Sequence, residues 1–226
     1  MTRGRKIIWP LVLIAAFGLS AATQHWLDDH QRPAFAAEDT LYLRSGEALK
    51  RASLGFTGLL ADMYWISTSI YFGEKFEQQR QLGETFDAGK LTLLRPMLDI
   101  IVDLDPHHVT AFRFGGFFLQ YDDPAEAVSF IELGIRNNPN EWRLYQDLGF
   151  AFWRQGKFRQ AAEAYNRGGQ LPGAPAWMQP MAATMIAKGG DRETARQIFL
   201  RLYEESEDDF VKQVCEEQLR MLQNSP

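Results

Sequence analysis

The chain has 226 residues, with 24 Lys and Arg against 29 Asp and Glu, and a formal net charge of −5. Without Arg3, Arg5 and Lys6, residues 7–226 hold 21 basic and 29 acidic side chains. This acidic balance argues against a nucleic-acid-binding protein, which needs a basic stripe. The single cysteine, Cys215, excludes an intramolecular disulfide and falls on the apolar side of a predicted helix, so we expect a small buried hydrophobe.

The N-terminus combines basic residues with an uncharged apolar stretch from Ile7 to Thr23. This pattern is typical of a membrane anchor or a signal peptide. The stretch lies at the lower limit of the ~17–25 residues that a membrane helix needs, and extension to Trp26 gives a comfortable length. We predict that residues 1–27 form an anchor or signal segment, with residues 7–26 in the membrane. Cleavage of the segment and a buried helix are the alternatives.

Residues 28–52 are predicted to be a linker, because their first half is polar and small with one proline. From Leu54 to Phe72 apolar residues recur at helical spacing, and residues 73–89 are polar with three glycines. A further helix is expected from about Leu91 to Leu104. We therefore predict a helix pair with an expanded turn over residues 53–107.

The segment 54–72 is also long enough to be a second membrane span, which would return the following residues to the cytoplasm. Asp62 near its centre argues against this alternative, because an unpaired aspartate at mid-membrane costs at least ~2.5–3.5 kcal/mol. A Tyr64-Trp65 pair in mid-segment is also atypical of a span.

Two glycines, Gly115 and Gly149, lie 34 residues apart in matching surroundings. Each follows an apolar residue and is followed 12 residues later by an alanine, Ala127 or Ala161. A large apolar side chain comes four residues after each alanine. Small residues at these positions would let two antiparallel helices approach closely.

This pattern resembles the tetratricopeptide repeat, W-x2-L-G-x2-Y followed by A-x3-F and P. Three copies hold one register, at residues 108–141, 142–175 and 176–209, and residues 210–226 are expected to be a C-terminal capping helix. The resemblance implies an all-α fold, a right-handed α-solenoid of helix hairpins preceded by one N-terminal transmembrane or signal helix. Residues 53–107 would then be a divergent pair that caps the stack.

The third copy departs from the family pattern. It carries Ala183 in place of the glycine, and Pro180 lies inside its predicted first helix. A proline is tolerated in the first turn of a helix and kinks the helix deeper inside, so several first residues for this helix are compatible with the sequence.

No motif for catalysis stands out in the sequence, which has no glycine-rich phosphate loop, no G-x-S-x-G and no H-E-x-x-H. The best metal-like group is Asp103, Asp105, His107 and His108, but it falls on an aspartate-proline turn that ordinarily stops a helix. We therefore expect no enzyme activity, no catalytic residue, no metal, no cofactor and no small-molecule substrate.

In the tetratricopeptide family, the first helices of the pairs line a concave groove that binds proteins or peptides. The resemblance carries this role onto nine positions: Phe112, Leu119, Arg143, Gln146, Phe150, Trp153, Arg154, Trp177 and Lys188. Phe150 and Trp153 beside arginines would suit an extended or helical peptide with acidic residues. The alternative is that a neighbouring helix covers the two aromatic side chains.

The sequence as a whole resembles membrane-anchored bacterial tetratricopeptide-repeat proteins. We expect a single-pass inner-membrane scaffold or adaptor, with its repeats in the periplasm or outside. It would bind a protein partner and support assembly of an envelope complex of the secretion, pilus or transport type. The alternatives are a soluble periplasmic protein after signal cleavage, a structural subunit of a large membrane complex, and a regulatory adaptor of an envelope hydrolase or protease.

Overall fold

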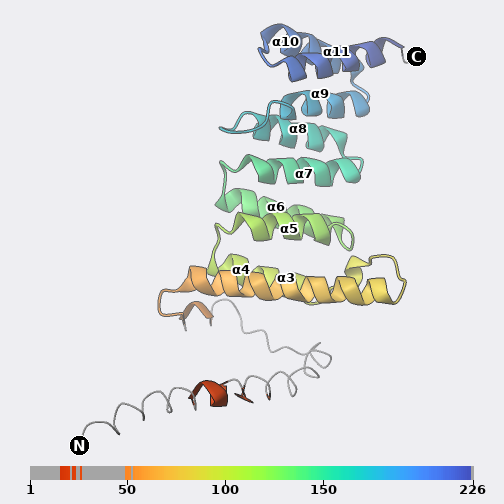
Figure 1. Cartoon of the computed structure of the whole chain (residues 1–226). Coiled ribbons are helices and arrows are strands. Elements are labelled where there is room, and N and C mark those ends of the chain that lie inside the picture. Colours follow the sequence, from red (N-terminus) through yellow and green to blue (C-terminus); the bar gives the residue numbers. More distant parts are fainter. Residues whose placement is uncertain (1–15, 21, 24–25, 27–48, 52, 225–226) are drawn as a thin grey trace, which may run out of the picture. The chain divides into compact units, whose positions relative to one another are not determined.

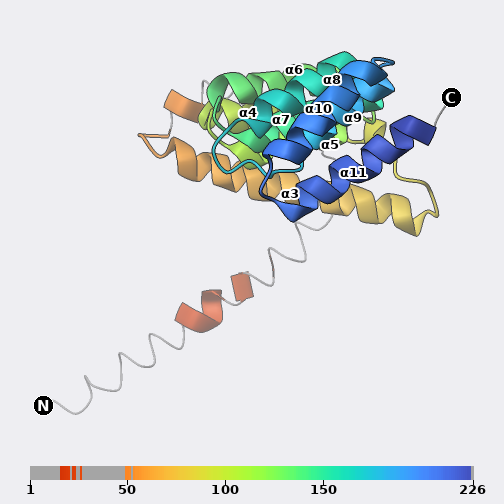
Figure 2. The same cartoon turned by 90° about the horizontal axis from the view of Figure 1, so that it is seen from above.

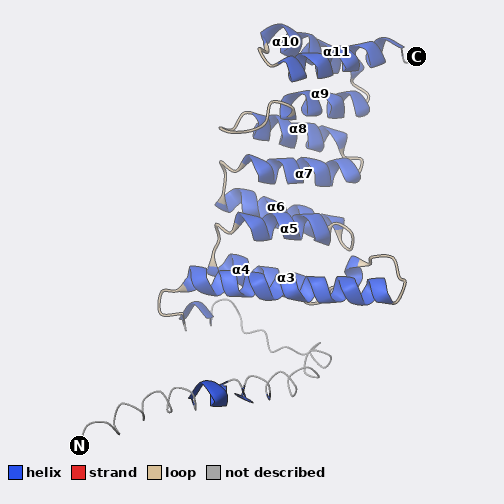
Figure 3. Cartoon of the chain, viewed as in Figure 1, coloured by secondary structure: helices blue, strands red, loops and turns tan. Residues whose placement is uncertain are grey.

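The computed structural model describes residues 16–20, 22–23, 26, 49–51 and 53–224. The chain divides into two units, Met1–Tyr42 and Leu43–Pro226, and only short pieces of the first unit are described. Throughout the described residues every regular element is a helix (Figure 3). The predicted all-α fold class is confirmed.

Helices of the second unit follow one another as a stack (Figure 1). In chain order they are α3 (Thr57–Gln81), the short 3-10 helix η2 (Ala88–Lys90), α4 (Leu94–Leu104), α5 (Val109–Leu119), α6 (Pro124–Asn137), α7 (Trp142–Arg154), α8 (Phe158–Gly169), α9 (Met178–Lys188), α10 (Arg192–Glu205) and α11 (Asp209–Asn224). From α3 to α11 each α-helix packs against the next, and α5 also contacts α7. Viewed along the stack, α11 is turned relative to α3 (Figure 2). Each predicted 34-residue segment contains two of these helices.

Aromatic rings pack directly onto glycines where two helices of a pair meet. A Cβ atom on Gly115 of α5 would lie 2.4 Å from Cε1 of Phe130 on α6. A Cβ atom on Gly149 of α7 would lie 2.8 Å from Cε2 of Tyr165 on α8. Cβ atoms essentially never come this close to another side chain, so an alanine at either position would force the facing ring or helix to move. The two glycines of the 34-residue pattern thus occupy equivalent places in consecutive helix pairs.

The core of the described residues falls into three successive clusters, each built from helices that are neighbours in sequence. The last cluster lies between α9, α10 and α11 and consists of Ala183, Ala195, Phe199, Leu202, Val211 and Cys215. Cys215 is fully buried, as the sequence predicted, and burial raises the pKa of its thiol to about 11.

Helix α3 is longer than the sequence predicted. It continues through residues 73–81, which we expected to be part of a polar turn. An exposed glycine inside a helix costs only ~1 kcal/mol, and Phe76 of the added turns stacks on Phe72 with 6.2 Å between ring centroids. Gln79 fixes the loop that follows, because its side chain accepts a hydrogen bond from the backbone N–H of Asp87 at 2.7 Å.

The start of α9 is also resolved by the structure. The helix begins at Met178, so Pro180 lies in its first turn, where the missing N–H would have no partner within the helix. The chain reaches this point through a connection over residues 170–177, which holds Pro172, Pro175 and a glycine with positive φ, Gly173. Because of this connection, α9 begins at Met178, two residues after the predicted start of the repeat at residue 176.

None of the described helices combines the length and the apolar character needed to cross a membrane. Helix α3 is among them, so it does not meet the requirement for the second span considered over residues 54–72. The anchor predicted over residues 7–26 lies mostly outside the described residues.

Replacement of Gly149 by alanine should lower the free energy of unfolding by ~1–3 kcal/mol, because the new methyl group overlaps the ring of Tyr165. Gly58 provides the control, since a Cβ there meets nothing within 4 Å and it lies in an exposed turn of α3. Gly58→Ala should leave stability unchanged or raise it by up to ~1 kcal/mol. Urea denaturation followed by circular dichroism measures both, and equal effects of the two substitutions would contradict the close-packing account.

Candidate functional site

Four aromatic side chains gather near the C-terminal ends of α5 and α7, and we call them the aromatic patch: Phe117, Tyr121, Phe150 and Trp153. The rings of Phe117 and Tyr121 are 5.8 Å apart, and those of Phe150 and Trp153 are 5.6 Å apart. Arg154 joins the two pairs, because its guanidinium lies 4.4 Å from the ring centroid of Tyr121. Phe117, Tyr121 and Trp153 remain 45%, 49% and 38% exposed.

The aromatic patch is not needed to fill the core. The inner side of α7 is already occupied by Tyr145, Leu148 and Phe152, which are all buried. Phe150 and Trp153 lie one helical turn apart on a different side of α7, so they form a local pair. A cluster of rings that is stabilised by a cation and still half in water is typical of a surface that binds a partner.

An ion pair between Arg113 of α5 and Asp147 of α7 connects the two helices that carry the patch. The Arg113 Nε atom donates to Asp147 Oδ2 at 2.8 Å, and the two residues are 34 positions apart. Asp147 is the more buried partner, with 19% of its side chain exposed against 39% for Arg113. Burial raises the pKa of the Asp147 carboxyl above its ordinary value, although the bond to Arg113 opposes this.

Two residues expected in the groove belong instead to the core. Phe112 is fully buried, its ring lies 5.2 Å from that of Phe130, and it fills the space over Gly134, where a Cβ would come within 2.7 Å of its Cγ atom. Leu119 is only 6% exposed and belongs to the same core cluster. The assignment of Phe112 and Leu119 to an accessible groove is therefore wrong, because α5 packs two sides against its neighbours.

The other predicted groove residues are spread along α7 and α9. Arg143 is exposed at the start of α7, where it pairs with Glu141 at 2.9 Å and lies over the ring of Trp142. Gln146 is half-buried one turn later. Trp177 is half-buried against Tyr165, and Lys188 is exposed at the end of α9. Of the nine predicted residues, Phe150 and Trp153 belong to the aromatic patch, and Arg154 contacts it through Tyr121.

Phe117 and Tyr121 were missed by the sequence analysis. Their spacing of four residues, at the end of a helix whose core positions are already filled, is the signal that could have found them. The repeat pattern placed neither residue in the groove. The contact of Arg154 with Tyr121 could not be predicted from the sequence of α7, because Tyr121 follows a different helix, α5.

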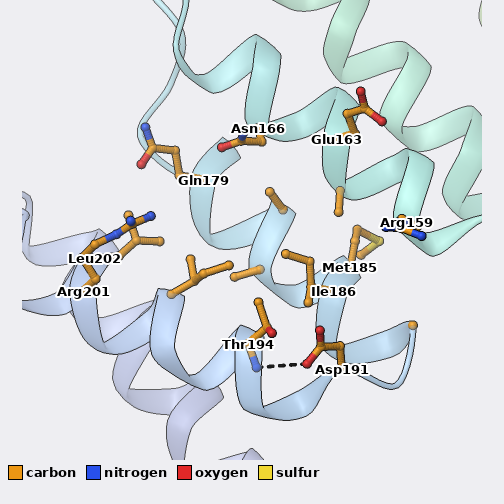
Figure 4. Close-up of a pocket in the computed structure, with 15 residues that line it drawn as sticks. Arg159, Glu163, Asn166, Gln179, Met185, Ile186, Asp191, Thr194, Arg201 and Leu202 are labelled. Carbon is orange, nitrogen blue, oxygen red and sulfur yellow. Dashed lines mark hydrogen bonds between the residues drawn. The ribbon is translucent and has the colours of Figure 1, made fainter.

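A cleft with a volume of about 690 Å³ lies between α8, α9 and α10 (Figure 4). Its floor is apolar and includes Met185 and Ile186, while its rim is polar. Arg159, Glu163 and Asn166 line one side of the rim, about one helical turn apart along α8. This cleft could not be predicted from the sequence, because it depends on small side chains such as Ala162 and Ala182 that leave the space open.

Asp191 and Thr194 close one end of the cleft, and their contact has a structural role. The carboxylate of Asp191 accepts a hydrogen bond from the Thr194 backbone N–H at 3.1 Å, which caps the start of α10 (Figure 4). Hydrogen bonds with Thr194 lower the pKa of Asp191. The cleft has no aromatic side chain among its lining residues, so it lacks the anchors found in the aromatic patch.

The group of aspartates and histidines weighed for metal binding forms turn contacts instead. Asp105 accepts from the backbone N–H of His107 at 2.9 Å, and His107 Nδ1 lies 3.2 Å from the side-chain oxygen of Asn138. His108 Nδ1 accepts from the backbone N–H of Ala111 and caps α5. Across the part of the chain that the structure describes, no group of three or more histidine, cysteine or acidic residues is placed to hold a metal ion.

No protein-family model and no curated protein sequence matches this chain. The relation to tetratricopeptide repeats therefore rests on the sequence pattern and remains a prediction.

Removal of Arg113 should destabilise the protein more strongly as the pH rises. The folded-state pKa of Asp147 is already raised, so the folded state binds a proton more tightly than the unfolded state, and stability falls as pH rises through that pKa. Arg113→Met leaves the carboxylate without its partner and raises its pKa further. We expect a loss of ~1–2 kcal/mol at pH 7 and a smaller loss at pH 4.

Arg196→Met is the matched control, because the ion pair of Arg196 with Glu193 is largely exposed. This control should change stability by at most ~0.5 kcal/mol at either pH. Urea denaturation at the two pH values measures both effects. A pH-independent loss in Arg113→Met would show that burial of Asp147 does not govern the effect.

Proposed function

We propose that this protein is a scaffold or adaptor that binds a protein partner through the aromatic patch, without chemistry of its own. In this proposal the helix stack is a right-handed α-solenoid of tetratricopeptide type. The architecture supports the proposal, because each helix contacts mainly its neighbours in sequence and the surface is extended. Such stacks offer binding faces rather than enclosed catalytic sites.

The observation that carries the proposal is the exposure of the aromatic patch. Phe117, Tyr121 and Trp153 leave more than a third of their surface in water, although aromatic side chains gain most from burial. Tryptophan, tyrosine and arginine are also the residues most often found at the energetic centre of protein interfaces. Trp153 and Tyr121 belong to the patch, and the guanidinium of Arg154 lies 4.4 Å from the ring centroid of Tyr121.

The charge of the patch indicates the chemistry of the partner. Arg154 brings a positive charge to the rings, whereas the nearby Asp147 is already neutralised by Arg113. A partner segment with aromatic or aliphatic side chains next to an acidic residue would complement both features. An extended or helical peptide satisfies this requirement.

The predicted N-terminal anchor gives the proposal its cellular setting. An anchor would hold the helix stack at the membrane surface, which raises the effective concentration for a membrane-bound partner. We propose a bacterial inner-membrane protein whose stack faces the periplasm and supports assembly of an envelope complex of the secretion, pilus or transport type.

Crosslinking in native membranes followed by affinity capture of the full-length chain tests the proposal. The double variant Phe150→Glu, Trp153→Glu places two acidic groups in the patch next to the apolar part of the partner. Because truncation of interface centres costs ~2 kcal/mol or more, capture of the partner should fall more than ~10-fold. Circular dichroism melting checks that the variant still folds.

A control with the same chemistry lies elsewhere on the stack. Leu200→Glu, Phe210→Glu changes two exposed apolar residues of α10 and α11 and should leave capture unchanged. If the patch variant captures the same partners as the wild type, the patch is not the binding site and the proposal fails.

A further inference from the structure

The N-cap residue and the outer side of α3 carry a stripe of exposed apolar side chains, which we call the α3 stripe: Phe56, Leu59, Met63, Ile66 and Ile70. Each is between 52% and 68% exposed. The opposite side of the helix is packed, since Ala61 and Thr68 are fully buried and α3 contacts α4. The exposed side is therefore not simply a loosely packed part of the core.

The position of α3 makes this exposure significant. The helix lies at one end of the stack of helices α3–α11 (Figure 1). The outer face of a terminal helix in a stack is normally polar, because nothing packs on it. A continuous apolar stripe at such an end, exposed among the described residues, marks a surface that a further partner can cover.

The spacing of the stripe indicates that the covering element is a helix. The five residues follow one another at intervals of three and four, and the next position in this series is Gly73. Alternating steps of three and four define the seam along which two helices pack side by side. The seam ends there, because the following two positions, Glu77 and Arg80, form an ion pair at 2.7 Å.

The α3 stripe is complementary to itself when two copies run antiparallel. In the register that overlaps the two stripes completely, Met63 faces Ile66 and Leu59 faces Ile70. At each end of the seam, Phe56 faces Gly73. A Cβ on Gly73 would meet nothing within 4 Å in its own chain, so the fold does not require glycine there. The pairing gives it a function, because the one seam position without a side chain lies opposite the largest one.

We propose that a second copy of this chain covers the α3 stripe, with the two α3 helices packed antiparallel about a twofold axis. A twofold interface uses the same surface on both subunits, which is the property that the stripe has. The residues that flank the seam include Asp62, Ser67 and Ser69. In the antiparallel register, Asp62 of one copy lies nearest to Ser69 of the other, so the two Asp62 carboxylates do not face each other.

Two further facts fit a second copy. Five half-exposed apolar residues on each of two helices supply on the order of 1,000 Å² of surface, which is the lower limit for a specific interface. The aromatic patch lies on α5 and α7 and shares no residue with the stripe, so the pairing is independent of the proposed partner binding.

Cysteine crosslinking of the full-length chain tests both the pairing and its register. Within one helix, residues 56 and 73 are roughly 25 Å apart, so a disulfide between them must join two chains. The double variant Phe56→Cys, Gly73→Cys should form a disulfide-linked dimer on a non-reducing gel, at least 10-fold more than either single variant. Native Cys215 is buried, and the wild-type chain controls for its contribution.

A second measurement does not depend on disulfide formation. Light scattering of the full-length chain in a mild detergent should give the mass of a dimer, and Met63→Glu, Ile66→Glu should reduce it to the monomer. Leu200→Glu, which alters an exposed apolar residue of α10, should leave the dimer intact.

Two outcomes would overturn the proposal. If Phe56→Cys alone forms the linked dimer as efficiently as the double variant, the helices pair in parallel and the antiparallel register is wrong. If the double variant forms no more dimer than the single variants and the wild-type chain is a monomer, the stripe is covered by another molecule, such as a different protein or a bilayer surface.

Discussion

The structure depends on the packing of aromatic rings onto positions that have no side chain. Gly115 accepts the ring of Phe130 and Gly149 accepts that of Tyr165 at distances that a methyl group could not tolerate. These contacts set the separation of the two helices in a pair. The same kind of contact joins α8 to both of its neighbours, because Tyr145 of α7 and Met178 of α9 pack against Gly168 of α8. The stack therefore grows by repeated use of one kind of contact.

The same packing explains which aromatic side chains remain outside. The spaces between the helices are filled by rings such as Phe112, Phe130 and Tyr165, and Phe117, Tyr121 and Trp153 lie outside these spaces. Phe117, Tyr121 and Trp153 are held at the surface by their positions in the chain, and Arg154 adds a contact to the ring of Tyr121. Their exposure follows from a core that is already complete, which is why we treat it as functional.

Much of the helical architecture could be predicted from the sequence, because the spacing of small and large residues reports directly on helix packing. The helices α5 to α8 begin and end close to the positions that the repeat pattern indicates. The length of α3 could not be predicted, since the contacts of Phe76 and Gln79 that hold its last turns come from a loop beyond it. Periodicity identifies residues that pack within one helix and says little about contacts with distant loops.

The candidate site was predicted only in part for a related reason. Carrying groove positions over from a family assumes that each first helix leaves the same side open, and α5 departs from this because Phe112 turns into the core over Gly134. Phe150, Trp153 and Arg154 were predicted because their spacing sets them apart from the core residues Tyr145, Leu148 and Phe152 of α7. Phe117, Tyr121 and the cleft beside α9 depend on how separate helices meet, and no single segment of sequence encodes that information.

The burial of Cys215 has a practical consequence for studying this molecule. A thiol reacts as the thiolate, and both its full burial and its pKa of about 11 protect it in the folded protein. Because the stack is built from contacts between neighbours, its ends can open without global unfolding. The rate at which a thiol reagent modifies Cys215 therefore reports how often α11 detaches from α9 and α10. Local opening at the C-terminal end of the stack can thus be measured in the native chain without an added label.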